Sequence, residues 1–235
     1  MAGRAHDVRV MNPSPQVRAA ALNNAAWCDL VCRSHEVRTI TSKQFWVALQ
    51  RTPPQYPDAV SLVENLNPAG FLRMIQNSPG ASVKDSFADL DLTAAGYQVR
   101  FTADWIAYEA PDGSAGLPEG WSVVSGAEEL AAWAAAGGLV HLISPALLEH
   151  PDVRILSRGG TAGAILNRSE AVVGISNLFA PEGADAVCVW TDVITCAASL
   201  FPGQALCGYE HGADLEHALK AGFTAVGPLR VWVRP

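Results

Sequence analysis

A run of turn-forming residues in the middle of the chain most constrains the fold. Residues 111–120 read Pro-Asp-Gly-Ser-Ala-Gly-Leu-Pro-Glu-Gly. Because proline fixes φ and lacks an N–H, and glycine and aspartate favour turns, this run cannot continue a helix or a central strand. Such segments commonly separate domains. We expect an N-terminal α/β subdomain over residues 1–115 and a second domain over residues 121–235.

Composition and charge restrict the class of protein. Of the 235 residues, 49% are hydrophobic and 17% are charged, which allows a sizeable core without a metal or disulfide framework. The net charge of -7 opposes binding to nucleic-acid phosphates. No apolar run reaches the ~20 residues that a membrane span needs, and the N-terminus lacks the apolar region of a secretory signal. We therefore expect a cytoplasmic protein with neither a nucleic-acid nor a membrane partner.

The first half begins with an alanine-rich segment, 16–33, whose apolar residues recur at helical spacing. A proline-rich stretch, 51–57, must be a loop. Residues 82–92 and 96–109 are typical of two consecutive strands, and we expect them to form an antiparallel pair.

The second half alternates strands and helices. The clearest feature is a hairpin formed by residues 160–167 and 171–179, which Arg168-Ser169-Glu170 connects. A helix over 190–200 follows it. The pattern then predicts a strand at 205–209, a helix at 214–221 and a closing strand at 225–234.

This order resembles the GNAT superfamily of acyl-CoA-dependent N-acyltransferases. The resemblance rests on the hairpin sequences 163–169 and 172–177, and on 205–210 followed by 214–223, which resemble the family's fifth strand and fourth helix. It implies an α/β (α+β) fold: a mixed, mostly antiparallel central sheet flanked by helices. It also implies an acyl-CoA cofactor, acetyl-CoA among others, and an amine substrate. The N-terminal half could be a degenerate second copy of the same half-fold or simply a smaller α/β subdomain, and the sequence leaves both open.

One segment departs from the family's pattern. In GNAT proteins the coenzyme's pyrophosphate lies on backbone N–H groups in a glycine-rich, basic segment before the third helix, where a helix N-terminus favours anions. Here the segment is Ala180-Pro181-Glu182-Gly183-Ala184-Asp185, with one glycine, two carboxylates and no basic residue. These charges would repel a diphosphate, which argues against the use of acetyl-CoA.

The segment 208–212, Gly-Tyr-Glu-His-Gly, is the most site-like cluster. Three residues capable of proton transfer lie at the carboxyl end of a predicted strand, where α/β sheets tend to bind ligands. Tyr209 is the candidate general acid, and Glu210 or His211 the candidate base for an amine. The alternative is a polar turn that caps the next helix.

Further residues are candidates for substrate binding. Ser176 and Asn177 end the adjacent predicted strand, where Asn177 could align an acyl carbonyl. Trp190 and Asp192 begin a predicted helix, and Asp192 could instead complement the helix dipole. Cys207 precedes the Tyr209 cluster as a possible nucleophile or as a buried thiol.

Together these features predict a GNAT-related N-acyltransferase acting on a small amine. Two alternatives stay open. The same fold could carry out another small-molecule transformation without coenzyme A, or it could be a non-catalytic ligand- or partner-binding protein. The histidines lack the spacing of metal ligands, so we expect no metal.

Overall fold

The computed structural model describes residues 14–113, 116–169 and 172–235. The described strands form a single 11-stranded sheet in the order β1-β2-β3-β4-β11-β5-β10-β9-β8-β7-β6. All neighbouring strands are antiparallel except the pairs β3–β4 and β9–β10. The expected mixed, mostly antiparallel α/β sheet is therefore confirmed.

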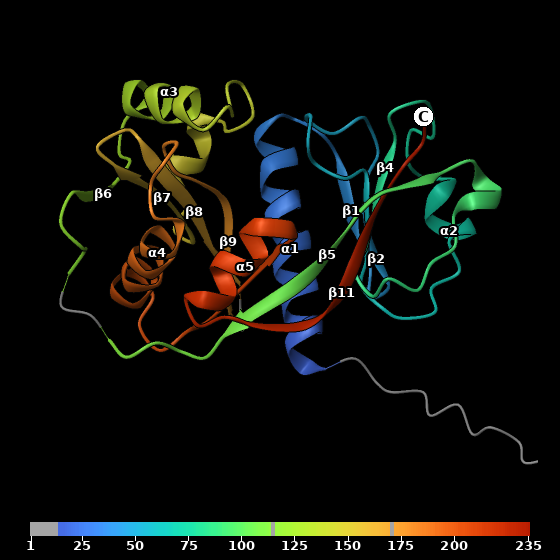
Figure 1. Cartoon of the computed structure of the whole chain (residues 1–235). Coiled ribbons are helices and arrows are strands. Elements are labelled where there is room, and N and C mark those ends of the chain that lie inside the picture. Colours follow the sequence, from blue (N-terminus) through green and yellow to red (C-terminus); the bar gives the residue numbers. More distant parts are fainter. Residues whose placement is uncertain (1–13, 114–115, 170–171) are drawn as a thin grey trace, which may run out of the picture.

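The N-terminal half supplies one end of the sheet and the helix at its centre (Figure 1). Its elements are α1 (Pro15–Ser34), β1 (Thr39–Thr41), β2 (Phe45–Ala48), β3 (Ala59–Ser61), α2 (Ala69–Leu72), β4 (Ser82–Asp85), the 3₁₀ turn η1 (Thr93–Ala95) and β5 (Gln98–Tyr108).

The C-terminal half supplies the other end. Its elements are β6 (Trp121–Val123), α3 (Ala127–Ala136), η2 (Pro145–Glu149), β7 (Val153–Arg158), β8 (Ala162–Arg168), β9 (Val172–Phe179), α4 (Ala186–Leu200), β10 (Ala205–Glu210), α5 (Gly212–Lys220) and β11 (Thr224–Val233).

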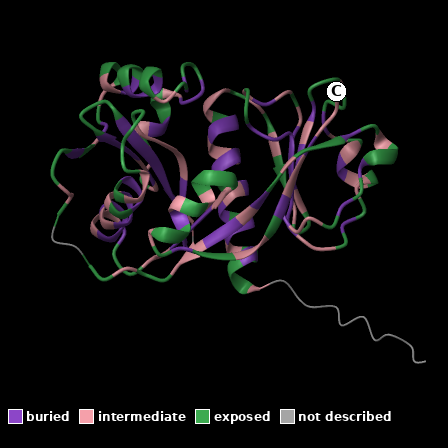
Figure 2. Cartoon of the chain, in the orientation of Figure 1, coloured by how far each residue is buried: buried purple, intermediate pink, exposed green. Residues whose placement is uncertain are grey.

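Helices cover both faces of the sheet. On one face α1 packs across β9, β10, β5 and β11, and its buried side chains join those of α3 and η2 in one core. On the other face α4 and α5 pack against each other and enclose a second core. Figure 2 shows that much of α1, at the centre of the molecule, is buried. No helix among the described residues has the length and apolarity to cross a bilayer.

A polar contact holds α1 on the sheet. Asn23 is buried, and its side-chain amide donates to the carbonyl of Asn167 at 3.0 Å and to the hydroxyl of Ser169 at 3.1 Å. Asn167 returns a hydrogen bond to Asn23 Oδ1 at 3.1 Å. A Cβ on Gly174 would lie only 2.0 Å from that oxygen, so glycine lets the helix approach β9 this closely.

Two predictions about the strands of the first half are wrong. The segment 82–92 is a strand only to Asp85, whose carboxylate accepts N–H groups of residues 87, 89 and 90 and so turns the chain. The expected pairing of 82–92 with 96–109 does not occur, because β11 lies between β4 and β5 and pairs with both. Strands on both sides of residue 115 thus share one sheet, while the domain boundary itself stays a prediction.

Candidate functional site

The parallel strands β9 and β10 separate near the centre of the sheet. They pair only as far as Cys207, which lies opposite Gly174. Beyond that point β10 stays with β5 through Glu210, and β9 stays with β8 through Phe179. A pocket of about 250 Å³ lies at this gap, lined by residues of both strands, of α1, of the 55–57 loop and of β4.

A bulge in β9 forms part of the pocket wall. Ser176 lies opposite Ile165 and Phe179 opposite Gly163, so β9 has one more residue than β8 over this stretch. Asn177, within it, has a positive φ of 52°. Because the extra residue of a bulge leaves the ladder, backbone groups here are released from pairing with β8.

Tyr209 and Glu210 approach the pocket from opposite faces of the sheet. The Tyr209 ring belongs to the core beneath α1, and it meets Trp105 edge-on with centroids 5.6 Å apart. Successive residues of a strand point to opposite faces, so Glu210 lies on the side of α5. Both residues line the pocket at the gap between the two strands.

Glu210 is a half-buried carboxyl with a raised pKa. Burial raises its pKa to about 8, and the nearby Asp214 carboxylate contributes to the rise. A carboxyl with this pKa is poised to exchange a proton near neutral pH, as a general base must.

Five of the sequence candidates come together at the pocket, and three lie elsewhere. Those at the pocket are Ser176, Asn177, Cys207, Tyr209 and Glu210. His211 is exposed at the start of α5, with its ring 5.0 Å from that of Phe101.

Trp190 and Asp192 lie on α4, on the face of the sheet opposite to α1. Trp190 is buried against Phe223, with ring centroids 5.1 Å apart. Asp192 accepts the indole N–H of Trp121 at 2.9 Å and pairs with Arg158 at 3.4 Å. The helix does not begin at Trp190 as predicted, because Asp185 caps it from Ala186 onward, so Asp192 lies inside α4 and not at its N-terminal end.

The Cys207 thiol is an unsuitable nucleophile. It is buried, and burial alone raises its pKa to about 12, so the reactive thiolate is scarce at neutral pH. The exposed His211 forms no pair with it among the described residues. No group of three or more potential metal ligands occurs in the described part of the chain.

The pocket also contains side chains that the sequence reasoning missed. Lys84 is buried and donates from Nζ to Asn24 Oδ1 at 2.8 Å, while Tyr56 and Trp27 lie beside the same space. Lys84 lies between Val83 and Asp85 in a short strand, so the sequence gives no local signal that its side chain is buried.

The N-terminus of α4 does not fit the diphosphate of coenzyme A. The Asp185 carboxylate already accepts the N–H groups of Val187 at 3.0 Å and Cys188 at 3.3 Å. These are the donors that a bound anion would use. Hydrogen bonds from Cys188 lower the pKa of Asp185, which stays ionised and would repel a diphosphate.

Comparison with solved structures identifies the fold. A GCN5-related N-acetyltransferase from Kribbella flavida is 18% identical, with a TM-score of 0.63 over 92% of this chain and 95% of that one. A protein from Novosphingobium aromaticivorans assigned to the GNAT acetyltransferases is 13% identical, with a TM-score of 0.57 over 92% and 99% of the two chains. A conserved protein of unknown function from Staphylococcus epidermidis is 10% identical, with a TM-score of 0.57 over 85% and 94%.

Sequence comparison adds no relative. No family model matches the sequence, and no curated protein matches it significantly. The structural similarity nevertheless extends over most of the chain, so the expected GNAT-like fold is confirmed.

Proposed function

We propose that the protein transfers an acyl group from a thioester to the amine of a small molecule bound between β9 and β10. The observation that carries the proposal is the Glu210 carboxyl, half-buried at the wall of this gap, where desolvation raises its pKa to about 8. The GNAT-like fold supports it, because the sequence resemblance implies acyl transfer to an amine.

The proposed step joins the amine to the acyl group and releases a thiol. The amine nitrogen attacks the thioester carbonyl carbon; the new C–N bond forms and the C–S bond breaks. The ionised Glu210 takes the proton that the amine loses. The leaving sulfur takes a proton from the hydroxyl of Tyr209, which solvent reprotonates. Asn177, at the bulge, aligns the acyl carbonyl.

The donor is proposed by chemical class as an acyl thioester. Acetyl-CoA is one such compound, but Asp185 occupies the N–H groups that its diphosphate would use. No role in the step is therefore assigned to the nucleotide part of a coenzyme. A short thioester should serve almost as well as acetyl-CoA.

The test incubates the full chain with a mixture of small amines and either S-acetyl-N-acetylcysteamine or acetyl-CoA, and detects N-acetyl products by mass spectrometry. We expect enzyme-dependent acetylation with kcat/KM values for the two donors within about tenfold of each other, because the diphosphate of acetyl-CoA gains no N–H donors at α4. A tenfold difference corresponds to about 1.4 kcal/mol in transition-state free energy. No product with either donor would overturn acyl transfer. A preference for acetyl-CoA of several hundredfold would contradict the interpretation of α4.

A second candidate function is favoured by the capped helix. A GNAT-like chain whose anion site is filled by its own Asp185 could be a ligand-binding protein without catalysis. In that case small ligands would raise the melting temperature, since binding to the folded state stabilises it, while neither thioester gave a product.

A further inference from the structure

We infer that the small molecule bound in this pocket carries a carboxylate as well as its amine, and that Lys84 and Tyr56 bind the carboxylate. The inference rests on the proposed function, because it names the substrate class of the same pocket. The acceptor would then be an amino acid.

Lys84 is a buried cation with a free hydrogen-bond donor. Its residue is 3% exposed. The ammonium donates to Asn24 Oδ1 at 2.8 Å, and it lies 4.0 Å from the centroid of the Tyr209 ring. An ammonium has three N–H groups, so one amide acceptor and one ring face leave a donor available to a ligand.

No carboxylate compensates this charge within residues 14–113, 116–169 and 172–235, where Lys84 has no ion pair. Glu210 is the one carboxyl among the described pocket residues, and its raised pKa keeps it largely uncharged at pH 7. Burying an unpaired charge is costly, which favours an anionic ligand group at this position.

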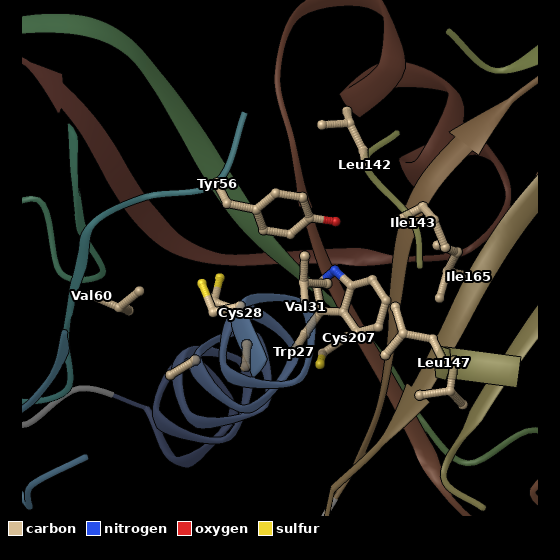
Figure 3. Close-up of a cluster of buried hydrophobic side chains, with 14 of the residues drawn as sticks. Trp27, Cys28, Val31, Tyr56, Val60, Leu142, Ile143, Leu147, Ile165 and Cys207 are labelled. Atoms are coloured by element: carbon tan, nitrogen blue, oxygen red, sulfur yellow. The ribbon is translucent and has the colours of Figure 1, made fainter. Parts of the chain in front are cut away.

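The Tyr56 hydroxyl provides a second donor. It is buried and has no hydrogen-bond acceptor among the described residues. It points toward the indole nitrogen of Trp27, which is itself a donor and cannot take the phenol proton (Figure 3). Burial raises the pKa of Tyr56, so the hydroxyl keeps its proton.

A second pocket adjoins the first and is also lined by positively charged side chains. It shares Tyr56, Lys84 and Tyr209 with the first pocket and is further lined by Arg51 and Arg100. No Asp or Glu is among its described lining residues. Arg51 is paired with the buried Asp58 at 2.7 Å, so Lys84 and Arg100 are the cations of this pocket that have no ion pair among the described residues. In a chain of net charge -7, their proximity favours an anion.

The two donors suit a carboxylate better than a phosphate. Lys84 and Tyr56 can each serve one carboxylate oxygen, whereas a phosphate has more oxygens and more charge than they can satisfy. The ligand's amine would then extend toward Glu210 at the other side of the gap.

The experiment measures binding to the full chain by calorimetry, using matched pairs that differ only in the carboxylate: glycine and glycinamide, L-leucine and L-leucinamide, L-phenylalanine and L-phenylalaninamide. O-phosphoethanolamine tests a phosphate in its place. We expect at least one amino acid to bind about tenfold or more tightly than its amide, since a truncated buried charge pair costs more than a factor of ten.

Variants assign the preference to the two side chains. K84M should abolish the difference between acid and amide, K84R should retain part of it, and Y56F should reduce it. K220M, which removes an exposed lysine on α5, should leave it unchanged. Circular dichroism checks that each variant folds, and Y56F serves if K84M does not fold.

Four results would overturn the inference: equal binding of acids and amides, binding of O-phosphoethanolamine in preference to every amino acid, an unchanged preference in folded K84M or Y56F, or no binding by any amino acid. Because the measurement is of binding alone, its failure is distinguishable from that of the proposed function. Acetylation of simple amines with no acid preference would leave acyl transfer standing. Amino-acid binding without acetylation would leave the inference standing.

Discussion

The gap between β9 and β10 and the N-terminus of α4 are the two places where a GNAT-like chain is expected to meet its ligands, and here they differ in how their donors are satisfied. At the gap, the buried Tyr56 and Ser176 hydroxyls have no hydrogen-bond acceptor in the described chain, and Lys84 has no ion pair there. At α4, the Asp185 carboxylate accepts the first free N–H groups.

This difference indicates where binding free energy is available. Buried donors without partners destabilise the free protein, and a ligand that satisfies them recovers that cost. The N–H groups of α4 that already donate to the Asp185 carboxylate contribute little binding free energy to an incoming anion. The structure therefore concentrates recognition on the acceptor side of the gap, and three changes test that contrast.

The largest expected effect is on turnover, at the gap. Glu210→Gln removes the proposed base while preserving its shape, and we expect kcat/KM for acyl transfer to fall at least about 100-fold. In the wild-type protein the rate should rise with pH through about 8, as Glu210 loses its proton, and E210Q should lose this dependence.

Glu216→Gln, an exposed change on α5, is the matched control and should leave the rate and its pH profile unaltered. Equal rates and equal pH profiles for the wild-type protein and E210Q would remove Glu210 from the mechanism.

The next effect is on stability, where α1 closes the pocket. Asn23→Ala removes the side-chain acceptor of the buried Asn167 amide and creates a cavity on β9, so the free energy of unfolding should fall by about 2–3 kcal/mol. Urea denaturation measures it. Gln16→Ala, on the exposed side of α1, is the control and should change the free energy of unfolding by less than about 0.5 kcal/mol. Equal losses of stability in the two variants would show that the pair of asparagine amides contributes nothing.

The smallest effect is at the helix end. Asp185→Ala removes the N-cap of α4 and should lower the melting temperature slightly, while transfer from a short thioester stays the same. Glu182→Ala, which removes a nearby charge without uncapping the helix, should be close to neutral in stability. A large loss of transfer in D185A would mean that the two places are not independent.

Local sequence patterns predicted the hairpin β8–β9, the strand β10 and the helix α5, because alternation, turn formers and a glycine stop are short-range signals. They could not place β11 between β4 and β5, since pairing between residues more than a hundred positions apart leaves no local trace. The true start of α4 was missed because the capping role of Asp185 was not recognised.

The candidate site was partly predictable, because some of its residues are marked by short-range sequence signals. Tyr209, Glu210 and Asn177 lie at strand ends, which the sequence marks. Lys84 and Tyr56 come from distant segments that meet only when α1 and the 55–57 loop pack over the gap, so no spacing rule relates them to Tyr209.

A crystal structure of the full chain with the tightest-binding amino acid tests the account most directly. We expect the ligand's carboxylate within hydrogen-bond distance, about 3 Å, of Lys84 Nζ and the Tyr56 hydroxyl, and its amine facing Glu210. A ligand seated at the N-terminus of α4, or anywhere outside the gap between β9 and β10, would contradict it.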